Sequence, residues 1–463
     1  MQRWARLAAA SAVVLSAACT TVTTRRELPN PDSRPYPPRR RQAPARVDST
    51  EAPAGGVAVG DSVVGIEDAG GTRMAPSTSI RVGVLVDADR VEVGGPGGLI
   101  VSGIDGREAA RVPAGGTVSF ASAGSGSVSV DVRGADGISI ARTVVPAPAV
   151  ARPANGEVLS LRGNPYRGEV VLQPSTSGAL TAVNRVDMEA YLLGVVPREL
   201  GPVGSQYPEA AKAQAVAART FAVKHLGGRS RQGFDVYAST ADQVYGGMAA
   251  EVPMVSEAVR ASRGEILTYG GTPIEAFYHS TCGGRTAGVD EVWNQPPVPY
   301  LISVVDVDPA TGEAYDRLSG KFRWTERWTG PELVSILNRT LADSLRGRTI
   351  REVRDARVVE RTASGRVRRL ALETDAGSFT LGKDRVRWIL LTARGAVLNS
   401  SRFDLSVSRD GSGAISAVTA EGMGWGHGIG MCQFGAIGRA LAGQDYRTIL
   451  RAYYPGARLV RAY

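Results

Sequence analysis

The sequence predicts an α+β protein, in which a β-rich N-terminal subdomain precedes a mixed α/β domain with a buried, alanine-rich helix. From residue 80 onward, short runs of alternating apolar and polar residues are separated by glycine-rich turns, as in short β-strands. Later segments show helical periodicity between helix start and stop signals. The 56 Gly and 26 Pro among 463 residues, with 6% aromatic residues, favour many turns over a helical bundle.

The length and composition indicate a folded chain of two or three domains. Hydrophobic residues make up 43% and charged residues 21%, which is enough to form a sizeable core. No apolar run reaches the roughly 18 residues that a membrane-spanning helix needs, and this argues against a membrane channel.

The N-terminus is typical of an exported protein. Arg3 and Arg6 precede a run of small and apolar residues from Leu7 to Ala18, so we expect residues 1–18 to be a cleaved signal peptide. The run ends in Leu-Ser-Ala-Ala-Cys, which is similar to a bacterial lipobox and predicts lipidation of Cys19. An ordinary signal peptide with a chance cysteine is the alternative.

Residues 19–77 have neither a helical nor a strand period and are rich in Pro, Arg, Thr and Gly, so we expect a disordered tether. Residues 1–46 contain nine arginines and two acidic residues, so most of the net charge of +9 lies in this segment. The rest of the chain is close to neutral, which argues against nucleic-acid binding and favours a solvated tether near an anionic surface.

We expect residues 78–150 to form a β-rich subdomain. Alternating residues predict its strands at 80–84, 90–93, 118–120, 128–130 and 138–140.

We expect residues 151–463 to form the second domain. Asp187 is suited to cap a helix over 188–195 that stops near Pro197, and Pro208 is suited to the first position of an alanine-rich helix. Because alanine lets neighbouring backbones approach closely, we expect this helix to be buried until two glycines end it. The glycines that end it are Gly227 and Gly228. We expect three further helices, near 330–346, at 433–441 and at 446–453.

The chain contains three cysteines. Lipidation of Cys19 leaves Cys282 and Cys432, and in an oxidising compartment we expect these two to form a disulfide. Two alternatives remain open. The pairs His279-x-x-Cys282 and His427-x4-Cys432 also make a Cys2His2 zinc set, and both thiols could be free. We expect no cofactor and no metal.

Four sequence blocks carry a resemblance to a known family. They read "MEAYLLGVVPREL", "YPEAAKAQAVAARTFAVKHL", "IEAFYHSTCGGRTAGVDEVW" and "GMGWGHGIGMCQFGAIGRALAGQDYRTILRAYYPG". In this order and at these separations they resemble the SpoIID/LytB family of peptidoglycan-acting proteins, and the likeness runs from about residue 80 to the C-terminus.

The resemblance implies a SpoIID-type catalytic domain with a glycan-binding cleft and lytic transglycosylase activity. Such an enzyme cleaves the MurNAc–GlcNAc bond, in sporulation members preferably on strands stripped of stem peptides, and leaves a 1,6-anhydroMurNAc end. The family's catalytic acid corresponds to Glu199. Some members also hold zinc through a His and Cys cluster after the alanine-rich helix, but the matching stretch "FDVYASTADQVYGG" contains neither residue type.

A lytic transglycosylase needs one carboxyl group, whereas a hydrolytic glycosidase normally needs two. That carboxyl group must be partly protonated near neutral pH, which burial against apolar side chains can achieve. Glu199 follows Val195, Val196 and Pro197 and precedes Leu200, so the sequence permits such burial. The alternative is a surface glutamate at a helix end.

The expected glycan-binding groove is lined by polar and aromatic residues. Arg219 lies among alanines and needs a partner, so a structural ion pair is an alternative role for it. Glycines occupy every second position from Gly422 to Gly430, which predicts an extended segment with one bare face. A structural crossing inside the core is the alternative for this segment. The candidate substrate-binding residues are Arg219, Gln243, Tyr245, His279, Trp425, which could stack on a sugar, and His427, which could bond its hydroxyls.

We therefore expect a lipid-anchored lytic transglycosylase of the cell envelope that acts on peptidoglycan glycan strands. A non-enzymatic amidase enhancer that binds glycan and stimulates a cell-wall amidase is the main alternative, and a purely structural envelope protein is a third. The lipid anchor is the only expected membrane contact. Thr20 after the lipidated cysteine is compatible with the outer membrane in a bacterium with two membranes.

Overall fold

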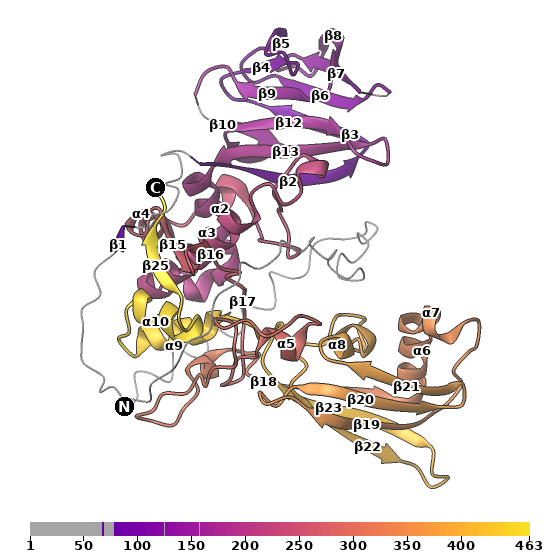
Figure 1. Ribbon diagram of the computed structural model, residues 1–463. Coiled ribbons are helices and arrows are strands. Elements are labelled where there is room, and N and C mark those ends of the chain that lie inside the picture. The colour runs from indigo at the N-terminus through magenta and orange to yellow at the C-terminus, as the bar shows by residue number, and fades with distance from the viewer. Residues whose placement is uncertain (1–66, 69–77, 125, 157) are drawn as a thin grey trace, which may run out of the picture. The chain divides into compact units, whose positions relative to one another are not determined.

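The computed structural model describes residues 67–68, 78–124, 126–156 and 158–463 (Figure 1). The predicted signal peptide and Cys19 lie outside the described residues. Within the predicted tether (19–77) the structure describes Glu67–Asp68, which form strand β1. Both strands and helices are present, so the α+β class is confirmed.

The N-terminal part of the described chain contains two antiparallel β-sheets, apart from one short parallel edge strand, β14. In β7, Val128, Val130 and Val132 are buried while the intervening residues are partly exposed, as expected for a strand with one face toward a core. One sheet has the strand order β14 (Val236–Tyr237), β2 (Ser79–Ala88), β13 (Leu180–Asp187), β12 (Glu169–Pro174), β9 (Ala149–Pro153), β4 (Leu99–Ser102) and β5 (Glu108–Val112). The other has the order β11 (Asn164–Arg167), β10 (Val158–Leu161), β3 (Arg90–Gly94), β6 (Thr117–Ser122), β7 (Ser127–Arg133) and β8 (Ser139–Pro146).

All five strands expected between residues 80 and 140 overlap strands of these sheets. The expected subdomain boundary at residue 150, however, falls inside β9, which pairs with β4 on one side and with β12 on the other. The pairing of β13 with β2 carries the same sheet on to Asp187. The consecutive strands of these sheets therefore continue almost forty residues beyond the expected boundary, and β14 (Val236–Tyr237) is added from further along the chain.

Five helices share one hydrophobic core with these sheets. Three of them follow the sheets in the sequence, and two come from the C-terminal end of the chain. The alanine-rich helix α3 is buried along most of its length, and Ala211, Ala215 and Ala218 have no exposed surface. A small sheet orders β1, β25 (Arg458–Arg461), β15 (Glu265–Tyr269) and β16 (Thr272–Pro273). The helices are α2 (Met188–Gly204), α3 (Pro208–His225), α4 (Pro253–Ala261), α9 (Gln433–Leu441) and α10 (Tyr446–Tyr453).

Helix α2 begins as predicted, because the Asp187 carboxylate accepts hydrogen bonds from the backbone N–H groups of Glu189 (2.9 Å) and Ala190 (3.2 Å). The expected stop near Pro197 is not observed. The helix continues past this proline and kinks at Gly201, whose φ of 71° is accessible to glycine without strain. Proline removes only one backbone donor, so the turn that carries Glu199 remains helical.

A second hydrophobic core is built around the fully buried Trp328, whose indole Nε1 donates to the Leu391 carbonyl (2.8 Å). The chain leaves the first core after Leu301 and returns to it at Ile429. Strand β24 (Met431–Cys432) then pairs in parallel with β17 (Tyr278–His279). The second core lies between β18 (Arg323–Thr329), β23 (Ile415–Met423), β22 (Phe403–Arg409), β19 (Val353–Arg361), β20 (Val367–Thr374), β21 (Gly377–Gly382), α6 (Gly330–Thr340), α7 (Ala342–Leu345) and α8 (Arg385–Ile389).

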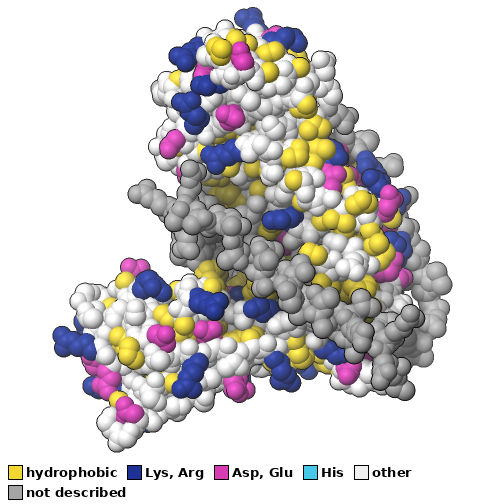
Figure 2. Space-filling model, turned by 180° about the vertical axis from the view of Figure 1, so that it is seen from behind, with side chains coloured by type: hydrophobic (Ala, Val, Ile, Leu, Met, Phe, Trp, Pro, Cys, Tyr) yellow, Lys and Arg dark blue, Asp and Glu magenta, His cyan; other side chains and the backbone are white. Residues whose placement is uncertain are grey.

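Short helical turns connect these elements, and basic and acidic side chains are interspersed on the face shown in Figure 2. Among the described residues, none of the helices is both long and apolar enough to cross a membrane. The short turns are η3 (Ser230–Gln232), η4 (Gly247–Ala250), α5 (Val289–Val292) and η5 (Tyr315–Leu318).

Candidate functional site

Glu199 lies in the last helical turn before the kink of α2 and is only partly exposed. Its Oε1 atom accepts a hydrogen bond of 2.6 Å from the backbone N–H of Val244. The side chains of Tyr278 and Gln433 also bond to its carboxyl group. The alternative of a solvated surface glutamate therefore does not describe this residue, because three segments distant in sequence converge on it.

Burial raises the pKa of Glu199 from 4.5 to about 7, although the bonds from Val244, Tyr278 and Gln433 each favour the charged form. None of these three partners is a carboxylate or a cation. The carboxyl group is therefore populated in both its protonated and its ionised form near neutral pH. A group in this state can donate a proton in one step and accept one in the next.

Gln243 is fully buried and positions the groups around Glu199. Its Oε1 accepts from the Tyr191 hydroxyl (3.1 Å), and its Nε2 donates to the Ala218 carbonyl (3.2 Å) and to the Tyr278 hydroxyl oxygen (3.1 Å). Because the Tyr278 oxygen accepts from Gln243, its own proton is available for Glu199. The structure thus places Gln243 behind Tyr278 and away from the surface.

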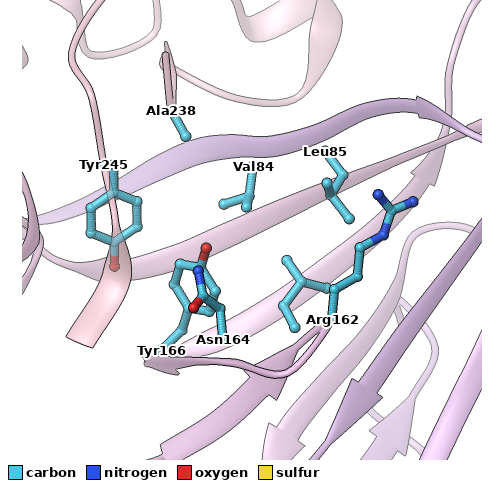
Figure 3. Close-up of a pocket in the computed structure, with 8 residues that line it drawn as sticks. Val84, Leu85, Arg162, Asn164, Tyr166, Ala238 and Tyr245 are labelled. Carbon is cyan, nitrogen blue, oxygen red and sulfur yellow. The ribbon is translucent and has the colours of Figure 1, made fainter. Parts of the chain in front are cut away.

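Tyr245 is also buried, and its hydroxyl donates to Asn184 Oδ1 (2.9 Å). Its ring lies 4.9 Å from that of Tyr191 and forms one wall of a pocket of about 270 Å³ (Figure 3). The residue before it, Val244, is the one that bonds to Glu199. The pocket is lined by Val84, Leu85, Leu161, Arg162, Asn164, Tyr166, Ala238 and Tyr245.

Arg219 has no exposed surface and forms a paired ionic contact with Glu189. Its Nε and Nη2 each lie 2.8 Å from a Glu189 carboxylate oxygen, and Nη1 donates to the Glu265 carbonyl (3.1 Å). The arginine therefore ties α3 to α2 and β15. This differs from the expected substrate-binding role and corresponds to the structural ion pair, because the guanidinium is enclosed by protein donors and acceptors.

The glycine-rich segment is not an extended strand with one bare face. Gly424, Gly426, Gly428 and Gly430 all have positive φ values between 70° and 106°, which other residues rarely adopt. A Cβ atom on Gly430 would collide with the Phe277 carbonyl oxygen. The segment is therefore a close crossing of backbones, in agreement with the structural alternative.

Two side chains of this segment were expected to contact glycan. The Trp425 indole is 47% exposed, and the ammonium of Lys321 lies 5.8 Å from its ring centroid. His427 is partly buried, with Nε2 donating to the Tyr278 carbonyl (2.9 Å) and Nδ1 accepting from the Ile429 N–H (3.1 Å). Burial lowers the pKa of His427 to about 4, so its ring is neutral. Only the tryptophan offers a broad open face.

His279, Cys282 and Cys432 are buried together, and each has a potential ligand atom within 4.8 Å of the others'. The expected disulfide is not formed, and both cysteines are free thiols. Burial raises the pKa of both thiols, that of Cys432 to about 11. His279 was expected to contact glycan but is enclosed in this cluster.

The zinc-binding stretch that the resemblance implies for some members does not fit here. Residues 234–247 offer two buried carboxylates, and both are already engaged. Asp235 pairs with Arg81 (2.6 Å) and Asp242 pairs with Arg229 (2.9 Å). Without His or Cys at these positions, no zinc set is available in this stretch.

Tyr278 and Gln433 are the site residues that the sequence alone did not reveal. They precede His279 and follow Cys432 directly, inside two of the four blocks that carry the resemblance. The parallel pairing of β17 with β24 brings both to Glu199. The signal in the sequence was that each residue is adjacent to a candidate metal ligand, His279 or Cys432. This signal becomes informative only when the pairing of β17 with β24 is known.

Comparison with known proteins supports the assignment of a family. A family model described as SpoIID, stage II sporulation protein, matches residues 176–269, which include α2, α3 and Glu199. A second family model, Domain of unknown function (DUF8618), matches residues 311–430, which contain the second core.

Three relatives match much of the chain. An amidase enhancer of Bacillus subtilis is 34% identical over 297 residues, which cover 58% of this chain but only 40% of the relative. The stage II sporulation protein D of the same organism is 29% identical, with 67% and 84% covered. That of Bacillus amyloliquefaciens is 31% identical, with 61% of this chain and 76% of the relative covered. The chain therefore belongs to the SpoIID family, represented by stage II sporulation protein D.

Proposed function

We propose that this protein is a peptidoglycan lytic transglycosylase in which Glu199 serves as both acid and base. The observation that carries the proposal is the pKa of about 7 for a buried carboxyl group held by neutral hydrogen-bond donors. The family assignment supports action on the cell wall. A transglycosylase needs only one carboxyl group that can both donate and accept a proton, and Glu199 can supply it.

In the first step the protonated Glu199 donates its proton to the glycosidic oxygen between MurNAc and GlcNAc. The bond from that oxygen to C1 of MurNAc breaks, and positive charge develops on the muramic ring. In the second step the Glu199 carboxylate removes the proton of the C6 hydroxyl, whose oxygen bonds to C1. The products are a 1,6-anhydroMurNAc end and a free GlcNAc hydroxyl, Glu199 is again protonated, and no water is consumed.

The neighbours of Glu199 stabilise the carboxylate that exists between these steps. The Val244 N–H already lies 2.6 Å from Oε1, so it needs no reorganisation when the negative charge appears. Tyr278 and Gln433 add two further donors. The exposed face of Trp425 is the proposed stacking surface for a sugar ring.

The experiment that tests this proposal incubates the full chain with peptide-free glycan strands and with strands that carry stem peptides. Mass spectrometry should reveal products ending in 1,6-anhydroMurNAc, formed faster from the peptide-free strands. Glu199→Gln should abolish them, while Glu257→Gln, at an exposed position on α4, should not. Equal product formation by Glu199→Gln would show that another group is the acid.

A non-enzymatic amidase enhancer is the alternative function, and the 34% identity to an amidase enhancer, over 40% of that relative, is the observation behind it. An enhancer would bind glycan strands and accelerate a purified cell-wall amidase without releasing anhydro products. Glu199→Gln would then leave the enhancement unchanged, because the carboxyl proton plays no part in binding alone.

We further propose that the protein acts in the cell envelope, held there by a lipid on Cys19. The lipobox-like run before this cysteine supports the proposal. Metabolic labelling with a fatty acid should mark the wild-type chain and leave Cys19→Ala unlabelled. Labelling of the variant would contradict the anchor site.

A further inference from the structure

The buried cluster of His279, Cys282 and Cys432 lies outside the proposed chemistry, and its atoms are arranged like the ligands of a metal ion. Asp316 belongs to an adjoining group, with Cys282 and Asp306, and like the two cysteines it has no exposed surface. Its Oδ2 lies 3.3 Å from Cys282 Sγ and 3.7 Å from Cys432 Sγ. In a tetrahedral zinc site, with Zn–S near 2.3 Å and Zn–O near 2.0–2.2 Å, a sulfur–oxygen edge is about 3.5 Å.

Two buried polar atoms at this cluster lack a hydrogen-bond partner among the described residues. They are Nε2 of His279 and Oδ1 of Asp316. The Nδ1 atom of His279 lies 3.1 Å from the Ile429 carbonyl oxygen, which can only accept, so Nδ1 carries the proton and Nε2 presents a lone pair. Buried polar atoms are seldom left unpaired, and a metal ion would satisfy the imidazole nitrogen. A backbone carbonyl behind a histidine is also the usual outer partner of a zinc ligand.

Several neighbours of the sulfur atoms can stabilise the thiolates that a bound zinc ion requires, although burial keeps both groups protonated in the absence of a metal. Cys432 Sγ accepts hydrogen bonds from the backbone N–H groups of Cys282 and Gly435, each 3.2 Å away, and it caps the N-terminus of α9. The fully buried Arg366 has no hydrogen-bond partner for its guanidinium among the described residues, and it interacts electrostatically with Cys282. Each of these features stabilises negative charge on sulfur.

We propose that His279, Cys282, Cys432 and Asp316 form a structural zinc site. Two thiolates, one imidazole and one carboxylate are a donor set that suits Zn²⁺. On binding, each thiol releases its proton to solvent and forms an S–Zn bond, so the two charges of the ion replace two protons. The net charge of the buried cluster is therefore unchanged. Burying the zinc ion costs less free energy than burying an isolated charge, because the two thiolates offset it.

This site differs from the Cys2His2 set that the sequence suggested. Both ring nitrogens of His427 are already used, by the Tyr278 carbonyl and the Ile429 N–H. Asp316 takes the fourth position instead. Asp306 also lies near Cys282, but it is engaged by Arg439 (3.0 Å) and by the Tyr453 hydroxyl.

The zinc site would fix the geometry around Glu199 without contacting it. Two of its ligands, His279 and Cys432, are the sequence neighbours of Tyr278 and Gln433. A zinc ion would therefore join β17 to β24 beside Tyr278, on β17, and Gln433, the first residue of α9, which both bond to the carboxyl group. This role rests on the proposed function, whereas the existence of the site does not.

The test measures zinc and thiols in the full chain with a Cys19→Ser background, so that only Cys282 and Cys432 are counted. Cells are grown with zinc, and the protein is purified without chelator. We expect about one zinc ion per chain by elemental analysis. We also expect two thiols that react with a disulfide reagent only after unfolding in EDTA. Two thiols that stay unreactive until a reductant is added would show a disulfide and overturn the proposal, as would a zinc-free protein with two free thiols.

Variants identify the ligands. Asp316→Asn and His279→Gln should each lower the zinc content at least about tenfold, whereas His427→Asn should retain it. Because a ligand variant could fail to fold, protein from cobalt-supplemented cells provides a second measurement. Wild-type protein should show the visible absorption bands of tetrahedral cobalt with thiolate ligands, and bands typical of octahedral cobalt would contradict the site. Neither readout depends on glycan cleavage.

Discussion

Replacing Glu199 with glutamine is expected to stabilise the folded protein, and to do so only at neutral and alkaline pH. Burial raises the pKa of this carboxyl group from 4.5 to about 7. The folded state therefore binds the proton more tightly than the unfolded state, and stability is lost as pH rises from about 4.5 to 7. Glutamine carries no charge and keeps the oxygen that accepts from Val244.

The magnitude follows from the difference between the two pKa values. At pH 8 the ionised Glu199 destabilises the fold by about 3 kcal/mol relative to a neutral side chain, and at pH 5 by less than about 1 kcal/mol. For a folding unit of roughly 400 residues, 3 kcal/mol corresponds to a rise in Tm of roughly 4 °C. Thermal unfolding of wild type and Glu199→Gln at both pH values measures this effect.

Glu257 provides the control, because it is an exposed glutamate on the surface of α4. Glu257→Gln should change Tm by the same small amount at pH 5 and at pH 8. Equal Tm values for Glu199→Gln and wild type at pH 8 would refute the reasoning, since they would mean that the carboxylate costs nothing in its folded environment.

Three further predictions concern the site and its support. The kcat/KM for peptide-free glycan should fall about tenfold per pH unit above pH 7 as the acid loses its proton, and a rate that keeps rising to pH 9 would oppose this assignment. Tyr278→Phe removes a donor to the carboxylate, so the alkaline limb of the pH–rate profile should move to higher pH while kcat falls by about 10- to 100-fold. If steady-state kinetics show the limb at an unchanged pH, the Tyr278 hydroxyl does not stabilise the Glu199 carboxylate. Arg219→Ala leaves the buried Glu189 without its cation and should cost about 3–5 kcal/mol in denaturant unfolding, and a loss below 1 kcal/mol would exclude a structural ion pair.

Local signals in the sequence were sufficient for several elements. The two C-terminal helices, Gln433–Leu441 and Tyr446–Tyr453, have the bounds that the sequence predicted. Asp187 caps α2 and Pro208 begins α3, because capping and proline preferences act within one turn. Such features depend on neighbouring residues only.

Features that depend on distant contacts were not predictable in the same way. The pairing of β13 with β2 joins residues about a hundred positions apart, so the expected boundary at residue 150 missed it. The partner of Arg219 is Glu189 on another helix, and the alanines around the arginine gave no indication of it. Alternating glycines suggested an extended strand, whereas the structure uses their positive φ values to cross other backbones.

The candidate site shows the same division. Glu199 came from the resemblance to a family, and its raised pKa agrees with the apolar residues around it in the sequence. Tyr278 and Gln433 reach it only because β17 and β24 pair, although about 150 residues, including the second core, separate them in the sequence. No local pattern can report a contact that depends on the chain's return.

The most direct test of the single-carboxyl mechanism is the reaction carried out in water labelled with ¹⁸O. If Glu199 directs the C6 hydroxyl of MurNAc onto C1, mass spectrometry should show 1,6-anhydroMurNAc ends that contain no ¹⁸O. A reducing MurNAc end that carries one ¹⁸O atom would show that water attacks C1, and it would contradict the account.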